Sequence, residues 1–89
     1  MTDTAVLRDD AVQLPGGPRL ALRRGSGPGR PFLLVHGLAS NARLWDGVAV
    51  LLLEAGHEVV AVDLRGHGRS EQVEDGYTTD QAADDLAAL

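Results

Sequence analysis

The sequence contains no cysteine, which excludes a disulfide framework, a thiolate nucleophile and any cysteine-based metal site. Aromatic residues are scarce, with one Trp, one Tyr and one Phe. No apolar run approaches the roughly 18 residues that a membrane span requires. Residues 1–10 carry three aspartates and no apolar segment, so they do not resemble a secretory signal, and a cytoplasmic location is expected by default.

Lysine is also absent, and the eight arginines are unevenly distributed along a chain of net charge −5. Five of them precede Pro31, whereas residues 71–89 contain six acidic residues and no basic one. An acidic chain without a basic stripe is a poor candidate for nucleic-acid binding. We therefore expect neither a nucleic-acid partner nor a membrane partner.

The length of 89 residues suits one small domain, residues 1–89, without internal repeats or a linker. A chain this short buries only somewhat more than about 60% of its extended surface on folding, so its core is expected to be marginal. Residues 2–10 are polar and expected to be frayed. Residues 12–14 and 20–22 are short apolar segments on either side of a Pro-Gly-Gly-Pro turn, which predicts a β-hairpin.

A strand, a helix and a second strand are predicted next. Residues 32–35 form a short apolar run that ends abruptly at His36, which favours a central strand buried on both faces. Ser40 or Asn41 can cap the helix, and Gly56 stands where a left-handed C-terminal cap is expected. The apolar residues at helical spacing are Leu44, Val48, Leu51, Leu52 and Ala55. Residues 59–62, rich in β-branched side chains, complete a parallel βαβ unit.

A glycine-rich loop, residues 63–77, leads to a second predicted helix. Thr78 and Gln81 have the spacing of a capping box, and Ala82, Leu86 and Leu89 share one face of the helix. No glycine, proline or terminal cation marks a natural end of that helix. From the sequence alone we expect the chain to be a truncated domain.

Two motifs stand at the carboxyl ends of the predicted parallel strands, where open α/β sheets bind ligands. The first is HGLAS at residues 36–40, and the second is DLRGHGRS at residues 63–70. With their order and spacing they resemble the α/β-hydrolase family, and the resemblance covers nearly the whole chain after Leu20. It implies an α/β fold, the N-terminal part of an α/β-hydrolase sheet, with an antiparallel hairpin, a parallel βαβ unit and a further helix. A flavodoxin-like or Rossmann-like fragment has the same order of strand, helix and strand. The turn after residue 35 lacks the GxGxxG pattern that binds a pyrophosphate, which argues against that alternative.

The HG turn suggests how such a chain would contribute to acyl transfer. That reaction builds negative charge on a carbonyl oxygen, and preorganised backbone N–H groups stabilise it. The resemblance places one oxyanion-hole donor, the catalytic contribution of this chain, at the backbone N–H of Leu38. It also implies that Gly37, Leu38 and Ala39 form the substrate-binding turn. Gly37 has an alternative interpretation as a turn glycine without a ligand, since both uses need the same residue.

The remaining polar residues of the motifs are interpreted as structural. The resemblance makes His36 a structural residue, because the catalytic base of the family comes from a later loop. His57 and His67 are expected at the surface, and no metal-ligand spacing is present, so neither a metal nor a cofactor is predicted. Asp63 and Arg65 are expected to pair with each other or with backbone groups to hold their loop rigid.

Hydrolysis by the chain alone is not expected. None of its serines, Ser26, Ser40 and Ser70, lies in the GxSxG pattern that presents a nucleophile. The sequence lacks HGGG, and Ala39 stands where many epoxide hydrolases and dehalogenases carry proline. Both features favour a serine esterase-like parent that acts on small molecules. The residues that decide between a Ser and an Asp nucleophile, and that supply the acid and the base, are not in this sequence.

A non-catalytic half-domain that completes its sheet with a partner chain is the alternative to a hydrolase fragment. In the family, the nucleophile strand lies beside the strand at residues 32–35. Without it that strand has an unpaired apolar edge, so we expect the isolated chain to dimerise or aggregate. Trp45 is expected to pack in the core rather than at a pocket rim.

Overall fold

The computed structural model describes residues 6–37 and 39–89. Four strands form one sheet in the order β1-β2-β4-β3. The strands are β1 (Arg8–Gln13), β2 (Arg19–Gly25), β3 (Gly29–Val35) and β4 (His57–Val62). A 3₁₀ turn, η1 (Ala42–Trp45), runs into helix α1 (Asp46–Glu54), and helix α2 (Thr79–Ala88) follows the long loop. β1 pairs antiparallel with β2, β2 antiparallel with β4, and β3 parallel with β4. The predicted hairpin, parallel βαβ unit and further helix are therefore confirmed.

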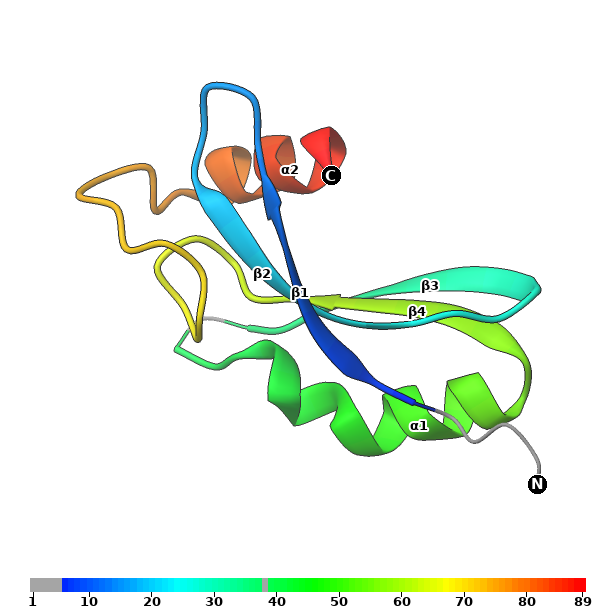
Figure 1. The fold of residues 1–89 in the computed structure, drawn as a ribbon. Coiled ribbons are helices and arrows are strands. Elements are labelled where there is room, and N and C mark those ends of the chain that lie inside the picture. Colours follow the sequence, from blue (N-terminus) through cyan, green and yellow to red (C-terminus); the bar gives the residue numbers. More distant parts are fainter. Residues whose placement is uncertain (1–5, 38) are drawn as a thin grey trace.

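The two helices cover opposite faces of the sheet, as Figure 1 shows. α1 and η1 share one apolar cluster with the sheet, and α2 contributes Leu86 to the cluster on the other face. The buried members of the first cluster are Leu34, Ala42, Ala49, Leu53, Val59 and Ala61. Those of the second are Leu14, Leu20, Leu22 and Val62. The part of the chain that the structure describes contains no helix long and apolar enough to cross a membrane.

The sequence predicted β3 as a central strand of the family's sheet, with an unpaired edge in this chain. It lies at the edge of the sheet, and β4 occupies the centre between β2 and β3. Within residues 6–37 and 39–89, β3 has a partner on one side only. Leu34 packs in the cluster beneath α1, whereas Leu33, on the opposite face, is 47% exposed. The run of apolar side chains predicted burial on both faces. That burial requires flanking strands and layers that the described residues do not provide.

The inward face of α1 also differs from the face expected. Leu44 and Leu51 are 64% and 67% exposed, and Val48 is exposed too, while Ala49 and Leu53 face the sheet. The helix is apolar almost all round, so its spacing could not select one face. The helix itself and its left-handed cap at Gly56, with φ of +93°, are as predicted.

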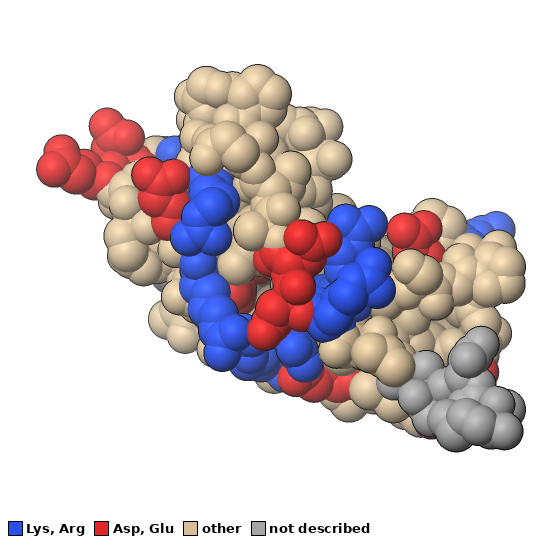
Figure 2. All heavy atoms as spheres, in the orientation of Figure 1, with Lys and Arg blue, Asp and Glu red and all other residues tan. Residues whose placement is uncertain are grey.

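β1 begins earlier than predicted because residues 8–10 pair antiparallel with residues 22–24 of β2. Arginines of other elements also contact these first residues. The carboxylate of Asp9 accepts ion pairs from Arg23, Arg43 and Arg69 at 2.8–3.0 Å. Arg23 also pairs with Asp46 at the start of α1. Figure 2 shows this cluster of arginine and aspartate side chains on the face of the molecule. Residues that looked too polar for a strand are thus tied to β2, η1 and the loop after β4.

Candidate active site

The two sequence motifs lie at the same edge of the sheet. Parallel pairing aligns Val35 of β3 with Val62 of β4, so the turn at residues 36–39 and the loop at residues 63–70 leave the sheet side by side. The carboxyl ends of parallel strands are where α/β sheets bind ligands. These two segments therefore lie where the candidate site is expected. The contacts of each motif residue show whether its side chain is engaged by the fold.

Asp63 is a structural anchor of this edge. Its side chain is almost fully buried, with 1% exposure. Oδ1 accepts the N–H of Ala42 at 2.7 Å, and Oδ2 accepts the N–H of Arg69 at 3.0 Å. The carboxylate therefore caps the start of η1 and closes its own loop, and it makes no ion pair with Arg65. Of the two interpretations of Asp63, the one that pairs it with backbone groups is correct.

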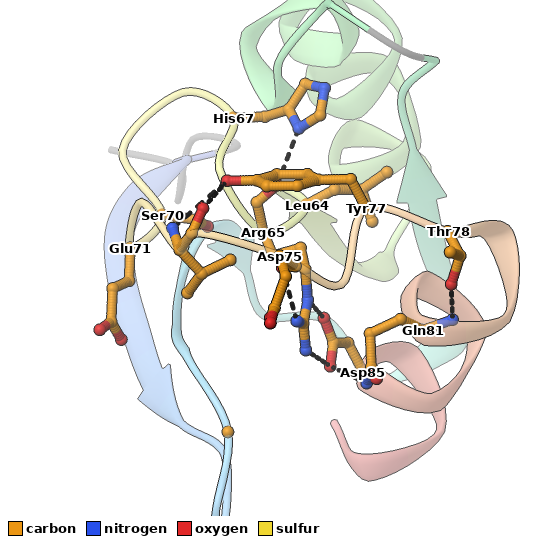
Figure 3. Close-up of polar contacts among 12 residues, drawn as sticks. Leu64, Arg65, His67, Ser70, Glu71, Asp75, Tyr77, Thr78, Gln81 and Asp85 are labelled. Carbon is orange, nitrogen blue, oxygen red and sulfur yellow. Dashed lines mark hydrogen bonds and ion pairs between the residues drawn. The ribbon is translucent and has the colours of Figure 1, made fainter.

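Arg65 pairs with Asp85 of α2 instead. Nε donates to Oδ2 at 2.7 Å and Nη2 donates to Oδ1 at 2.8 Å, in the two-point geometry drawn in Figure 3. This hydrogen-bonded ion pair lowers the pKa of the Asp85 carboxyl below its ordinary value of 3.8, although burial opposes the shift, and raises the pKa of Arg65. Asp85 is 4% exposed, so the pair locks α2 onto the loop.

Asp85 is the important residue that sequence reasoning missed. It lies three residues after Ala82 and one before Leu86, on the side of α2 that faces the fold. An acidic residue on the apolar face of a helix signals a buried cationic partner, because an unpaired buried carboxylate is costly. Thr78 caps α2 as predicted, its Oγ1 accepting the N–H of Gln81, but the Gln81 side chain reaches Asp85 and does not close a capping box.

The glycines and the serine of the second motif are also structural. Gly66 and Gly68 have φ of +72° and +51°, a region that L side chains rarely adopt. A Cβ on Gly68 would lie 2.4 Å from the Asp63 carboxylate, so no other residue fits. The hydroxyl of Ser70 is buried, accepts the N–H of Ala21 at 2.8 Å and donates to the carbonyl of Asp63. Ser70 is therefore engaged by the fold and not available as a nucleophile.

His36 occupies the interior of the site, with 4% exposure. Its Nε2 accepts the N–H of Leu64 at 3.0 Å, and its Nδ1 donates to the carbonyl of Gly37 at 2.6 Å. Both ring nitrogens are engaged by backbone, which agrees with its structural interpretation. Since neither nitrogen faces open solvent, His36 has no lone pair left to act as a base.

His67 is less exposed than expected. Its ring is partly buried, Nδ1 donates to the carbonyl of Arg65 at 2.9 Å, and Nε2 accepts the N–H of Ala39 at 3.1 Å. The ring of His36 lies 5.0 Å away between centroids. His57, at the other end of β4, is also only partly exposed and meets Phe32 edge-on. No group of three potential metal-ligating side chains occurs within the described ranges 6–37 and 39–89.

The turn after β3 is the open part of the site. Gly37 is exposed, its φ lies outside the left-handed region, and a Cβ added to it would meet no atom within 4 Å. Ala39 has φ of +63°, a conformation that costs a residue with a Cβ about 1–2 kcal/mol. Leu38, the predicted oxyanion donor, lies outside the described residues.

An apolar pocket of about 450 Å³ opens beside this turn, between the end of β3, the loop after β4 and α2. Its lining residues include Val35, Leu64, His67, Tyr77, Ala82 and Leu86. Figure 3 shows the Tyr77 ring next to His67, with its hydroxyl directed away toward residue 73. Trp45 packs partly against the core under α1, on the other face of the sheet, and is therefore not at the rim of this pocket.

The family follows from comparison with known proteins. A family model described as the α/β hydrolase fold matches residues 30–89, and the chain belongs to the α/β-hydrolase family. Its elements are those of the N-terminal part of that fold, including both motifs.

Particular relatives show how much of the fold is covered. A non-heme haloperoxidase of Rhodococcus erythropolis is 43% identical over 63 residues, 71% of this chain and 23% of that protein. A bifunctional esterase/perhydrolase of Acinetobacter calcoaceticus is 48% identical over 54 residues, 61% of this chain and 20% of that protein. The solved structure of a deformylase from Pseudomonas putida superposes with a TM-score of 0.83 at 38% identity, covering 92% of this chain and 32% of that one. The chain spans less than a quarter of the length of these two curated relatives.

Proposed function

We propose that residues 36–39 form the oxyanion-hole turn of an esterase-like α/β hydrolase that acts on small-molecule substrates. The backbone N–H of Leu38 is one donor, and Gly37, Leu38 and Ala39 line the substrate site. The observation that carries this proposal is the open space beside Gly37, at the carboxyl edge of the sheet. Gly37 is exposed, and a Cβ added to it would meet no atom within 4 Å among the described residues, so a substrate can approach the backbone there.

A substrate carbonyl is the ligand that fits this turn within the family. A preorganised N–H donor directed at the developing oxyanion is worth about 2.7–4 kcal/mol of transition-state stabilisation. The pocket beside the turn offers apolar surface for the rest of a small substrate. The esterase/perhydrolase and deformylase relatives are named for reactions at carbonyl carbon, which supports acyl chemistry for this chain.

The nucleophile of that reaction does not come from these 89 residues. Ser26 and Ser40 lie outside any GxSxG pattern, and the Ser70 hydroxyl is engaged by Ala21 and Asp63. His36 and His67 have both ring nitrogens hydrogen-bonded to backbone. We therefore propose that residues 1–89 are part of a hydrolase domain and do not hydrolyse esters alone. The cytoplasmic location and the lack of a cofactor stay predictions.

The first experiment is to sequence the gene downstream of the Leu89 codon and to translate it in all frames. A GxSxG pattern followed by a late Asp and His is the expected result and identifies a serine hydrolase. An Asp at the nucleophile position changes the class to a dehalogenase-like or epoxide-hydrolase-like enzyme. Finding neither contradicts the proposal that this chain serves catalysis.

The second experiment tests the turn in the product of that complete reading frame. Gly37→Val is expected to reduce hydrolysis of p-nitrophenyl acetate by 100-fold or more, the usual cost of losing one oxyanion donor. Gly47→Val is the matched control, because Gly47 is also exposed, with no atom within 4 Å of an added Cβ, but lies in α1. Equal activities of the two variants would exclude residues 36–39 from the site.

A non-catalytic half-domain that pairs with another chain is the second candidate, and the free edge of β3 favours it. Leu33 is 47% exposed there, and an apolar groove of about 310 Å³ runs beside it. We expect this edge to make the isolated chain dimerise or aggregate, as measured by size-exclusion chromatography with light scattering. Leu33→Lys should restore a monomer, whereas Val48→Lys, at a site on α1 with 46% exposure, should not. A monodisperse wild-type monomer would contradict this candidate.

A further inference from the structure

Two histidines form hydrogen bonds between the candidate oxyanion turn, residues 36–39, and the neighbouring loop, residues 63–70. His36, in the turn segment, accepts the N–H of Leu64 in the neighbouring loop at 3.0 Å. His67, in that loop, accepts the N–H of Ala39 in the turn at 3.1 Å. The two rings lie 5.0 Å apart, tilted by 47°. Each loop is therefore held by a side chain of the other.

The contacts define one proton arrangement for each ring. Nδ1 of His67 lies 2.9 Å from the carbonyl oxygen of Arg65, which can only accept, so Nδ1 carries the proton. Nε2 then has a free lone pair, which the Ala39 N–H occupies. His36 has the same arrangement, with Nδ1 directed at the Gly37 carbonyl. This geometry fits the proton on Nδ1 of both rings, because a proton at Nε2 would face an N–H donor.

Ala39 is the residue that needs such support. Among the described residues it alone combines a Cβ with a positive φ, +63°, so the surrounding structure has to hold its conformation. Its N–H donates to His67, the side-chain contact that holds this residue. A backbone hydrogen bond from the Ser40 N–H to the Gly37 carbonyl at 3.2 Å also closes the turn. Ala39 directly follows Leu38 in the chain, so the same turn contains the proposed oxyanion donor.

We infer that His67 is a positioning residue for the oxyanion turn, and this inference rests on the function proposed above. His67 touches no reacting atom and acts through the Ala39 backbone. The titratable groups around it are His36 across the turn, Tyr77 in the shared pocket and Arg65 in its own loop, whose guanidinium is paired with Asp85. No carboxylate contacts the ring among the described residues, so no carboxylate is in place to stabilise a charged ring.

The first test determines the tautomer of the His67 ring in the wild-type chain. Solid-state ¹⁵N NMR of the histidine-labelled protein distinguishes the two tautomers in a monomer and in an assembly alike. The expected result is a neutral His67 ring with the proton on Nδ1, assigned by the loss of its signal in His67→Gln. A ring with its proton on Nε2, or a charged ring at neutral pH, would overturn the inference.

The second test follows the turn itself, by hydrogen exchange of the Ala39 amide. His67→Leu removes the acceptor and should accelerate that exchange by about tenfold or more. His67→Gln can present Oε1 to the same N–H and should restore most of the protection. His57→Leu, at the far end of β4, is the control and should leave Ala39 unchanged. Unchanged exchange in His67→Leu, or no rescue by glutamine, would refute the positioning role.

These readouts separate the inference from the proposed function. Tautomer and amide protection do not depend on turnover. If both results are as expected and the complete gene product hydrolyses no ester, the contact stands and the hydrolase proposal fails. If hydrolysis is found while His67→Leu leaves the Ala39 amide protected, the hydrolase proposal stands and the positioning role of His67 fails.

Discussion

The two segments at the carboxyl edge of the sheet differ in how far the fold itself uses their polar groups. In the loop at residues 63–70, Asp63, Arg65 and Ser70 are all buried or paired within the chain. In the turn at residues 36–39, Gly37 is exposed and has open space around it. The longer and more distinctive motif is therefore scaffold, and the shorter one is the part that remains open to a ligand.

This difference predicts unequal sensitivity to substitution, and the largest effect should fall on Asp63. Asp63→Ala leaves the N–H groups of Ala42 and Arg69 without their acceptor in a buried site, at about 1–3 kcal/mol each. We expect a loss of about 3–4 kcal/mol in the free energy of unfolding, measured by urea denaturation. Glu74→Ala, an exposed acid in the same connection, should change it by less than about 0.5 kcal/mol. A loss below 1 kcal/mol for Asp63→Ala would show that the loop is not the scaffold.

Gly68→Ala should have the next largest effect. The substitution places a Cβ 2.4 Å from the Asp63 carboxylate at a φ of +51°. Left-handed backbone costs about 1–2 kcal/mol for alanine, and overpacking adds a comparable amount. We expect a loss of about 2–3 kcal/mol, read as a lower urea midpoint with an unchanged slope. A tolerated alanine would mean that Asp63 can move away without loss.

The ion pair between Arg65 and Asp85 should make the chain sensitive to acid. Because the pair lowers the folded-state pKa of Asp85 below 3.8, its contribution is present at neutral pH. It is lost as the pH falls from about 5 through the folded-state pKa, where the folded carboxylate becomes protonated. Asp85→Asn should reduce the free energy of unfolding at pH 7 by about 2 kcal/mol and flatten its decline over that acid range. An equally steep decline in Asp85→Asn, measured by urea titrations from pH 7 to 3, would assign the acid sensitivity to other carboxylates.

Local chemistry explains which parts of the fold could be predicted from the sequence. The apolar runs around Leu34 and Val59, the cap at Thr78 and the left-handed Gly56 each depend on a few adjacent residues. These patterns predicted the hairpin, the βαβ unit and both helices. The two motifs also meet at the carboxyl ends of β3 and β4, as predicted, because parallel strands bring these ends together.

The parts that could not be predicted depend on contacts between distant residues. Arg65 and Asp85 are separated by 20 positions, and Ala39 and His67 by 28. The pairing of β2 with β4 joins the hairpin to the βαβ unit, and no local pattern encodes it. The inward face of α1 could not be read from its pattern, because leucines occur on both sides of the helix, with Leu53 buried and Leu51 exposed.

The smallest effect is expected at Gly37, and it is the most informative for function. Gly37→Ala adds a Cβ that meets no atom within 4 Å, at a φ outside the left-handed region, so the free energy of unfolding of this chain should change by less than about 0.5 kcal/mol. The matched partner is Gly68→Ala, the same substitution in the neighbouring loop. A loss at Gly37 as large as that at Gly68 would give the turn glycine a purely structural explanation and remove the observation on which the oxyanion proposal rests. A neutral result leaves a glycine that folding does not require, at the edge of the sheet where a substrate would bind.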